Sequence, residues 1–166
     1  MRYEQTSCDS CDIKILDACC GSRMFWFDKN EPHTTYMDIR DESHVLCDGR
    51  ILDVHPDIIA DCRHTGFPDD TFNLIVFDPP HLVSAGDNSW LKKKYGKLPK
   101  DWESFLHESM AELMRVLKVG GTLIFKWNET QVKLSDVLSA IEPFKPLLGQ
   151  RMQSNGKTIW LTFMKF

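Results

Sequence analysis

The sequence predicts an α/β domain built on a mostly parallel sheet, with an antiparallel pair of strands at its C-terminal end. The first observation is that short apolar segments alternate with segments of helical periodicity. The second is that four of the apolar segments each end in an aspartate, which is typical of strands buried on both faces that end at a ligand-binding edge. The third is Ser154-Asn155-Gly156, a strong hairpin signal between residues 147–152 and 157–166.

The parallel part of the expected sheet consists of short strands. Four of them are each followed directly by an aspartate. These strands cover residues 13–16, 34–37, 57–60 and 72–77, and the aspartates that follow them are Asp17, Asp38, Asp61 and Asp78. A fifth strand is expected over residues 122–127. Because ligands gather at the carboxyl ends of parallel strands, the four aspartates are predicted to face a common binding site.

Three segments are expected to be helical, and one region shows no clean periodicity. That region is 39–56, where we expect a loop and a short helix. Apolar residues at helical spacing and capping residues identify the helices. The first expected helix begins within residues 22–30, after Ser22. The second covers 101–118, with Asp101 as its cap and Gly120-Gly121 as its end, and the third covers 132–141.

The composition is that of one globular domain. With 42% hydrophobic and 27% charged residues, the chain is expected to fold as a single domain over 1–166, in which 1–11 is flexible or loosely packed. The polar N-terminus is unlike a signal peptide, and no apolar run approaches the roughly eighteen residues of a membrane span. We therefore expect a cytoplasmic protein without membrane contact. The net charge of −4 argues against holding nucleic acid by bulk electrostatics but permits a local basic patch.

The six cysteines all lie in the first 62 residues. Cys8-x-x-Cys11 has the spacing of half a zinc site, but a second pair at matching spacing is missing. In a reducing compartment disulfides are not expected either. Free thiols are the favoured interpretation, and no metal is expected.

The sequence Asp78-Pro79-Pro80-His81 follows the strand at 72–77 and predicts a chemical site. Proline has no backbone N–H, so two consecutive residues offer carbonyl acceptors and no backbone donors. Together with the Asp78 carboxylate they form a rigid edge of acceptors, which suits an NH2 group with its two hydrogens. Such hydrogen bonds would stabilise the positive charge that develops on an amine as it attacks an electrophile.

Three segments resemble the class I S-adenosylmethionine-dependent methyltransferases. The sequence ILDACCGSR (15–23) resembles the Gly-rich cofactor turn, and YMDIR (36–40) resembles the segment with the ribose-binding acid. The sequence ADCRHTGFPDDTFNLIVFDPP (60–80) resembles the third region, in which Asp61 and the Cys62 N–H would face the adenine. The resemblance implies S-adenosylmethionine as cofactor and a three-layer Rossmann-like sandwich. Its mostly parallel seven-stranded sheet would receive an antiparallel last strand from the terminal hairpin.

Carried over residue by residue, the resemblance assigns a cofactor site. Cys19 and Arg23 stand where the family pattern has glycines, so they either reshape the turn or contact the cofactor themselves. The residues assigned to the cofactor are Asp17, Ala18, Cys19, Cys20, Gly21, Arg23, Asp38, Ile39, Asp61, Cys62 and Asp78.

The DPPH sequence resembles the D/N-P-P-aromatic motif of amino-methyltransferases, which act on adenine N6, cytosine N4 or glutamine amides. The resemblance implies that Asp78, Pro79, Pro80 and His81 are catalytic, with His81 in the place of the usual aromatic residue. A nucleic-acid amino-methyltransferase, with adenine ahead of cytosine, is the leading hypothesis. A methyltransferase acting on a protein amide or a small-molecule amine, and a non-catalytic cofactor-binding module, are the alternatives.

Lysines lie among aromatic residues in the loop that follows this motif. Such a pattern suits phosphate contacts and base stacking, although a solvated loop would look the same. The predicted substrate-binding residues are Trp90, Lys92, Lys93, Lys94 and Tyr95. The expected partner is nucleic acid, DNA ahead of RNA, with the target base flipped out or single-stranded. Since the chain has no room for a separate target-recognition domain, a partner subunit or a homodimer is an open possibility.

Overall fold

The computed structural model describes residues 13–45, 48–86, 89–153 and 156–166. The strands in these ranges are β1 (Ile15–Asp17), β2 (Thr34–Asp38), β3 (Glu42–Val45), β4 (Ile51–Val54), β5 (Ile58–Ile59), β6 (Phe72–Phe77), β7 (Leu117–Asn128), β8 (Leu148–Arg151) and β9 (Thr158–Met164). The helices are α1 (Trp90–Tyr95), α2 (Trp102–Val116) and α3 (Leu134–Ala140). The predicted loose segment 1–11 and the Cys8–Cys11 pair lie outside the described residues.

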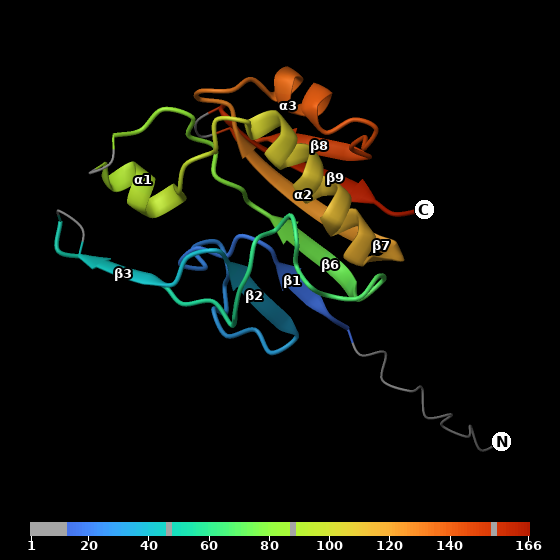
Figure 1. Ribbon diagram of the computed structural model, residues 1–166, viewed down its shortest axis with the longest axis horizontal. Coiled ribbons are helices and arrows are strands. Elements are labelled where there is room, and N and C mark those ends of the chain that lie inside the picture. The colour runs from blue at the N-terminus through green and yellow to red at the C-terminus, as the bar shows by residue number, and fades with distance from the viewer. Residues whose placement is uncertain (1–12, 46–47, 87–88, 154–155) are drawn as a thin grey trace, which may run out of the picture.

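Seven strands form one sheet in the order β5-β2-β1-β6-β7-β9-β8 (Figure 1). The pairs from β5 to β7 are parallel, whereas β9 runs antiparallel between β7 and β8. The expected mostly parallel sheet with an antiparallel C-terminal hairpin is therefore confirmed. The chain order changes direction between β1 and β6, and ligands bind at such a switch point in open α/β sheets.

The two faces of the sheet are covered differently. On one face the apolar side of α2 packs on the strands through Leu106, Met110 and Leu113, all fully buried, and α3 packs beside α2. On the other face Phe25 meets Trp160 of β9 edge-to-face, with ring centroids 5.8 Å apart. The expected helix within 22–30 is wrong, because this segment consists of turns and bends.

Other sequence predictions also need correction. Residues 39–56 contain the antiparallel hairpin of β3 and β4, where we expected a loop and a short helix. Helix α2 ends at Val116, and Gly120-Gly121 lies inside β7 instead of ending the helix. The strand expected over 57–60 is reduced to the two residues of β5.

None of the helices in the described ranges is long and apolar enough to cross a membrane. The same part of the chain contains no group of three or more His, Cys, Asp or Glu residues that could hold a metal ion.

Candidate cofactor and substrate site

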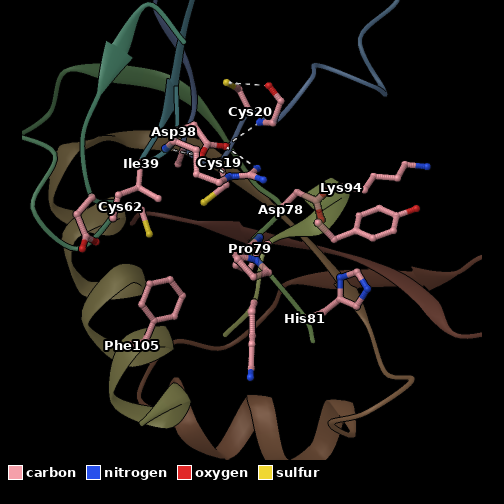
Figure 2. A pocket seen from close by; sticks show the side chains of 18 of the residues that line it. Cys19, Cys20, Asp38, Ile39, Cys62, Asp78, Pro79, His81, Lys94 and Phe105 are labelled. Atoms are coloured by element: carbon pink, nitrogen blue, oxygen red, sulfur yellow. Dashed lines mark hydrogen bonds and ion pairs between the residues drawn. The ribbon is translucent and has the colours of Figure 1, made fainter. Parts of the chain in front are cut away.

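A cavity of about 310 Å³ opens at the carboxyl ends of β1, β2, β5 and β6 (Figure 2). Its size is near the lower end of the range for small-molecule sites, roughly 300–1,000 Å³. The predicted site residues in its lining are Ala18, Cys19, Cys20, Gly21, Asp38, Ile39, Asp61, Cys62, Asp78, Pro79, Pro80, His81, Lys94 and Tyr95. The predicted residues outside the lining are Asp17, Arg23, Trp90, Lys92 and Lys93.

Asp17 supports the wall of the cavity from behind. It is completely buried at the end of β1, where its carboxylate accepts a hydrogen bond from Trp26 Nε1 at 2.7 Å and a longer one from the Cys19 N–H at 3.4 Å. Burial raises the pKa of Asp17 to about 7, against these hydrogen bonds, which lower it. Asp17 therefore fixes the shape of the turn that follows β1.

The turn after β1 contains two residues with left-handed backbone conformation. Gly21 has φ +49°, and its N–H donates to Asp38 Oδ2 at 2.9 Å. Arg23 has φ +55°, and its guanidinium stacks on the Tyr36 ring and bonds to Asp57. The sequence left open whether Arg23 reshapes the turn or contacts the cofactor. Its left-handed backbone and its contacts with Tyr36 and Asp57 indicate that it shapes the turn.

Asp38 lies at the end of β2 with its acceptor positions in use. Besides the Gly21 N–H, it accepts hydrogen bonds from the backbone N–H, Nε and Nη2 of Arg40. A carboxylate offers about four lone-pair positions, so a further ligand must compete with a donor already present. The Arg40 side chain is the donor that can move without unfolding the turn.

Asp61 and Cys62 form the cavity wall after β5. Arg63 forms hydrogen bonds with both carboxylate oxygens of Asp61 and holds the pKa of that carboxyl below its usual range. Cys62 is buried, and its Sγ lies 3.3 Å from Ser109 Oγ of α2. A ligand in this part of the cavity would meet a paired carboxylate and a buried thiol.

The Asp78 carboxylate is bound by Lys126 of β7. Phe77 is in register with Phe125, so the next residue on each strand comes side by side. Burial raises the pKa of Asp78, whereas the Lys126 charge and hydrogen bond lower it. The ammonium also lies 5.5 Å from the Phe25 ring centroid. The acceptor edge predicted from the sequence is thus paired with a cation.

His81 and Tyr95 place two rings beside this edge. Their ring centroids are 5.2 Å apart with an interplanar angle of 52°. Burial, with a smaller contribution from the Lys126 charge, lowers the pKa of His81 to about 4. His81 is therefore neutral near pH 7, and its ring lies beside the Tyr95 ring in the cavity lining.

Helix α1 lies within the segment expected as a basic loop, beyond the carboxyl ends of β2 and β6 in Figure 1. Three contacts hold it there. A Cβ on Gly96, which ends α1 with φ +72°, would meet Pro80 Cγ at 3.0 Å, so the chain packs closely on the motif. The Leu98 N–H donates to the Leu82 carbonyl, and Arg40 Nη1 donates to the carbonyl of Lys93 at 3.0 Å.

Sequence reasoning missed Arg40, Lys126 and Phe105, all of which contact the site. Phe105 lines the cavity from α2, and its helical pattern marked it as a core residue. The sequence signal for Lys126 was a charge between Phe125 and Trp127 in an otherwise mostly apolar strand. Arg40 was part of the ribose-acid segment, but nothing in the pattern indicated that it pairs with Asp38.

Comparison with known proteins gives a structural result only. No family model matches the sequence, and none of the curated proteins matches it. A TehB-like SAM-dependent methyltransferase from Corynebacterium glutamicum is 17% identical with a TM-score of 0.58, covering 93% of this chain and 81% of that chain. An rRNA methylase from Streptococcus thermophilus is 16% identical with a TM-score of 0.56, covering 93% and 89%. At these identities the similarity establishes the fold, which is the Rossmann-like fold of these methyltransferases.

Proposed function

We propose that this protein transfers a methyl group from S-adenosylmethionine to an exocyclic amino group of adenine, or of cytosine, in nucleic acid. The observation that carries the proposal is that the DPPH residues and the turns after β1, β2 and β5 line one cavity. When bound, S-adenosylmethionine would supply an electrophilic methyl group on a sulfonium. The structural neighbours named as SAM-dependent methyltransferases support the choice of cofactor.

The residues around the cavity fit such a cofactor. The Asp38 carboxylate suits a ribose diol, and the turn from Ala18 to Gly21 gives close access to the cavity because Gly21 has no side chain. Ile39 and Phe105 offer apolar surface for an adenine ring. Arg40 would have to give up part of its bonding to Asp38 for the ribose to bind there.

Asp78 and the Pro79 carbonyl would orient the target amine. Both accept hydrogen bonds, so they can hold the two N–H groups and stabilise the positive charge that develops on nitrogen. The Asp78 carboxylate must be ionised for this role. Lys126 favours that state but also places a positive charge nearby, so the amine and the ammonium would compete for the same carboxylate.

His81 and Tyr95 would supply the stacking surface for the target base. A neutral imidazole stacks on a base without the cost of burying a charge, and Tyr95 adds the aromatic ring that position 81 lacks. Because both rings lie inside the cavity lining, the base would have to leave a duplex to reach them.

Lys92, Lys93 and Lys94 give α1 a local basic surface in a chain of net charge −4. Replacing all three with Gln is expected to weaken nucleic-acid binding and to lower the slope of log K against log[salt] by about one per lost phosphate contact. Fluorescence anisotropy with mixed-sequence single-stranded DNA and RNA at several salt concentrations measures both. A variant with Lys29, Lys133 and Lys145 replaced by Gln matches the charge change, and an equal loss in that variant would contradict the role of α1.

Replacing Asp38 with Asn is expected to weaken binding of S-adenosylhomocysteine about 10- to 100-fold, since a charged acceptor for the ribose is lost. Isothermal titration calorimetry measures the affinity. Asp53→Asn, on β4 and outside the cavity lining, is the control and should bind like the unmodified protein. Equal affinities in all three proteins would place the ribose elsewhere.

The reaction is tested by incubating the protein with methyl-labelled S-adenosylmethionine and, separately, unmethylated DNA, total RNA or cell protein. RNA is included because an rRNA methylase is among the structural neighbours. Label in DNA or RNA, at an exocyclic amine identified by nucleoside mass spectrometry, is expected. Label only in protein would overturn the choice of substrate. Tight cofactor binding without any transfer would also overturn it, in favour of a small-molecule substrate or the non-catalytic module.

A further inference from the structure

Two cysteine thiols from separate turns meet in the wall of the cavity. Cys19 follows β1 and Cys62 follows β5, and both line the cavity. Each thiol shifts the pKa of the other, and Figure 2 shows both sulfur atoms in the same part of the cavity wall. Nothing in the proposed methyl transfer uses this pair.

The surroundings give the two thiols unequal chemistry. The hydrogen bond from Cys19 lowers the pKa of Cys62 and raises that of Cys19, so Cys62 ionises first. The Ser109 hydroxyl donates to the Phe105 carbonyl at 2.7 Å and accepts from the neutral Cys62 thiol, but it can rotate to donate once Cys62 is a thiolate. A thiol whose pKa is lowered, next to one whose pKa is raised, is the arrangement of a reactive cysteine with its resolving partner.

Access distinguishes this pair from an ordinary buried thiol. Cys62 is 5% exposed, but Cys19 is only partly buried and both line an open cavity, so a small oxidant can reach them through the space that the cofactor would fill. Cys20, although adjacent in sequence, donates its thiol hydrogen to the Gly21 carbonyl. Among the described cysteines, its thiol is thus directed to a backbone carbonyl and not to the Cys19–Cys62 pair.

We infer that Cys19 and Cys62 form a site of reversible oxidation, at which a hydroperoxide converts the two thiols into a disulfide that blocks the cofactor cavity. The Cys62 thiolate attacks the peroxide, so that an S–O bond forms, the O–O bond breaks and an alcohol or water leaves. Cys19 then attacks the sulfenic acid, an S–S bond forms and water leaves. The two thiols together supply the two electrons that reduce the peroxide.

The disulfide would change the shape of the cofactor site directly. An S–S bond of about 2.05 Å would draw the two sulfurs together, and so pull the turn after β1 toward the turn after β5. Since Cys19 stands in the turn that carries the Gly21–Asp38 hydrogen bond, the ribose acceptor would shift with it. Oxidation and ligand binding are thermodynamically linked. The factor by which the disulfide weakens ligand affinity should equal the factor by which bound ligand disfavours disulfide formation.

The covalent part is tested without reference to any activity. In a chain with Cys8, Cys11 and Cys47 replaced by Ser, treatment with hydrogen peroxide followed by non-reducing tryptic digestion should link peptide 15–23 to peptide 51–63. Cys20→Ser should keep the linked peptide, and Cys19→Ser should abolish it. A link that survives Cys19→Ser, or a Cys62 that stops at sulfenic or sulfinic acid in the parent chain, would overturn the inference.

The effect on the cavity rests on the proposed function, because its probe is S-adenosylhomocysteine. Calorimetry should show binding about tenfold weaker or worse after oxidation. Dithiothreitol should restore binding, and saturating S-adenosylhomocysteine should slow formation of the link. Unchanged affinity in the linked protein would overturn the blocking role. If the reduced protein does not bind S-adenosylhomocysteine at all, the proposed function fails, while the linked peptide still decides the oxidation site.

Discussion

Replacing Asp78 with alanine is expected to reduce methyl transfer about 10²- to 10³-fold, because the charged acceptor that stabilises the developing cation is lost. The affinity for S-adenosylhomocysteine should change only a few-fold, since the ribose and adenine would bind to other residues. Asp101→Ala removes an exposed carboxylate at the start of α2, outside the cavity lining, and serves as the control. Initial rates with methyl-labelled S-adenosylmethionine and a calorimetric affinity for each protein provide the comparison.

Two further variants separate the role of Asp78 from simple damage to the site. Asp78→Asn keeps one carbonyl acceptor, so it should retain more activity than Asp78→Ala. Lys126→Met removes the cation that favours ionisation, and burial then raises the pKa of Asp78 further. The acid limb of the pH–rate profile should therefore move to higher pH in Lys126→Met. An unchanged profile, or full activity in Asp78→Ala, would show that the carboxylate does not orient the amine.

Asp17 is expected to make the protein less stable as the pH rises. Its pKa is about 7 in the folded protein and 3.8 when exposed, so between these values the folded state binds the proton more tightly. The stabilisation is complete below about pH 4 and is lost as the pH rises through 7. Across that range the free energy of unfolding should fall by at most about 4 kcal/mol from this group.

The comparison with Asp17→Asn isolates this effect from the other titrating groups. Asparagine cannot ionise, so the variant should not lose this stability as the pH rises. The free energy of unfolding of Asp17→Asn minus that of the unmodified protein should therefore increase with pH. Urea unfolding at pH 4, 5.5, 7 and 8 measures that difference. A difference that does not change with pH would mean that Asp17 is ionised in the folded protein throughout this range.

The strands of the large sheet could be predicted because burial on both faces leaves a mark in the sequence. The segment ending at Asp78 is apolar over nearly its whole length, as a central parallel strand must be. The hairpin of β3 and β4 has no such mark, because its side chains alternate between exposed and covered positions over only four residues per strand. Helix α1 is likewise too short for a periodic pattern, and its position depends on contacts distant in sequence.

Positions in the cavity lining could be predicted where one short segment carries them. Asp78 and its two prolines are adjacent, so their combined effect is visible in the sequence. The side chains that pair with these carboxylates could not be read from adjacent residues. Lys126 comes beside Asp78 through strand register, and Arg40 reaches Asp38 by folding back across a turn. The expected helix after Ser22 failed because Arg23 adopts a left-handed conformation, which helical periodicity does not reveal.

The hydrogen bonds of Arg40 join the Asp38 end of the cavity to helix α1. One guanidinium serves both the Asp38 carboxylate and the backbone carbonyl of Lys93 on α1. Any ligand that draws Arg40 away from Asp38 therefore also changes how firmly the lysine-bearing helix is held. Occupation of the two sites is therefore coupled, and under the proposed function each substrate should change the apparent affinity for the other when both are varied in steady-state kinetics.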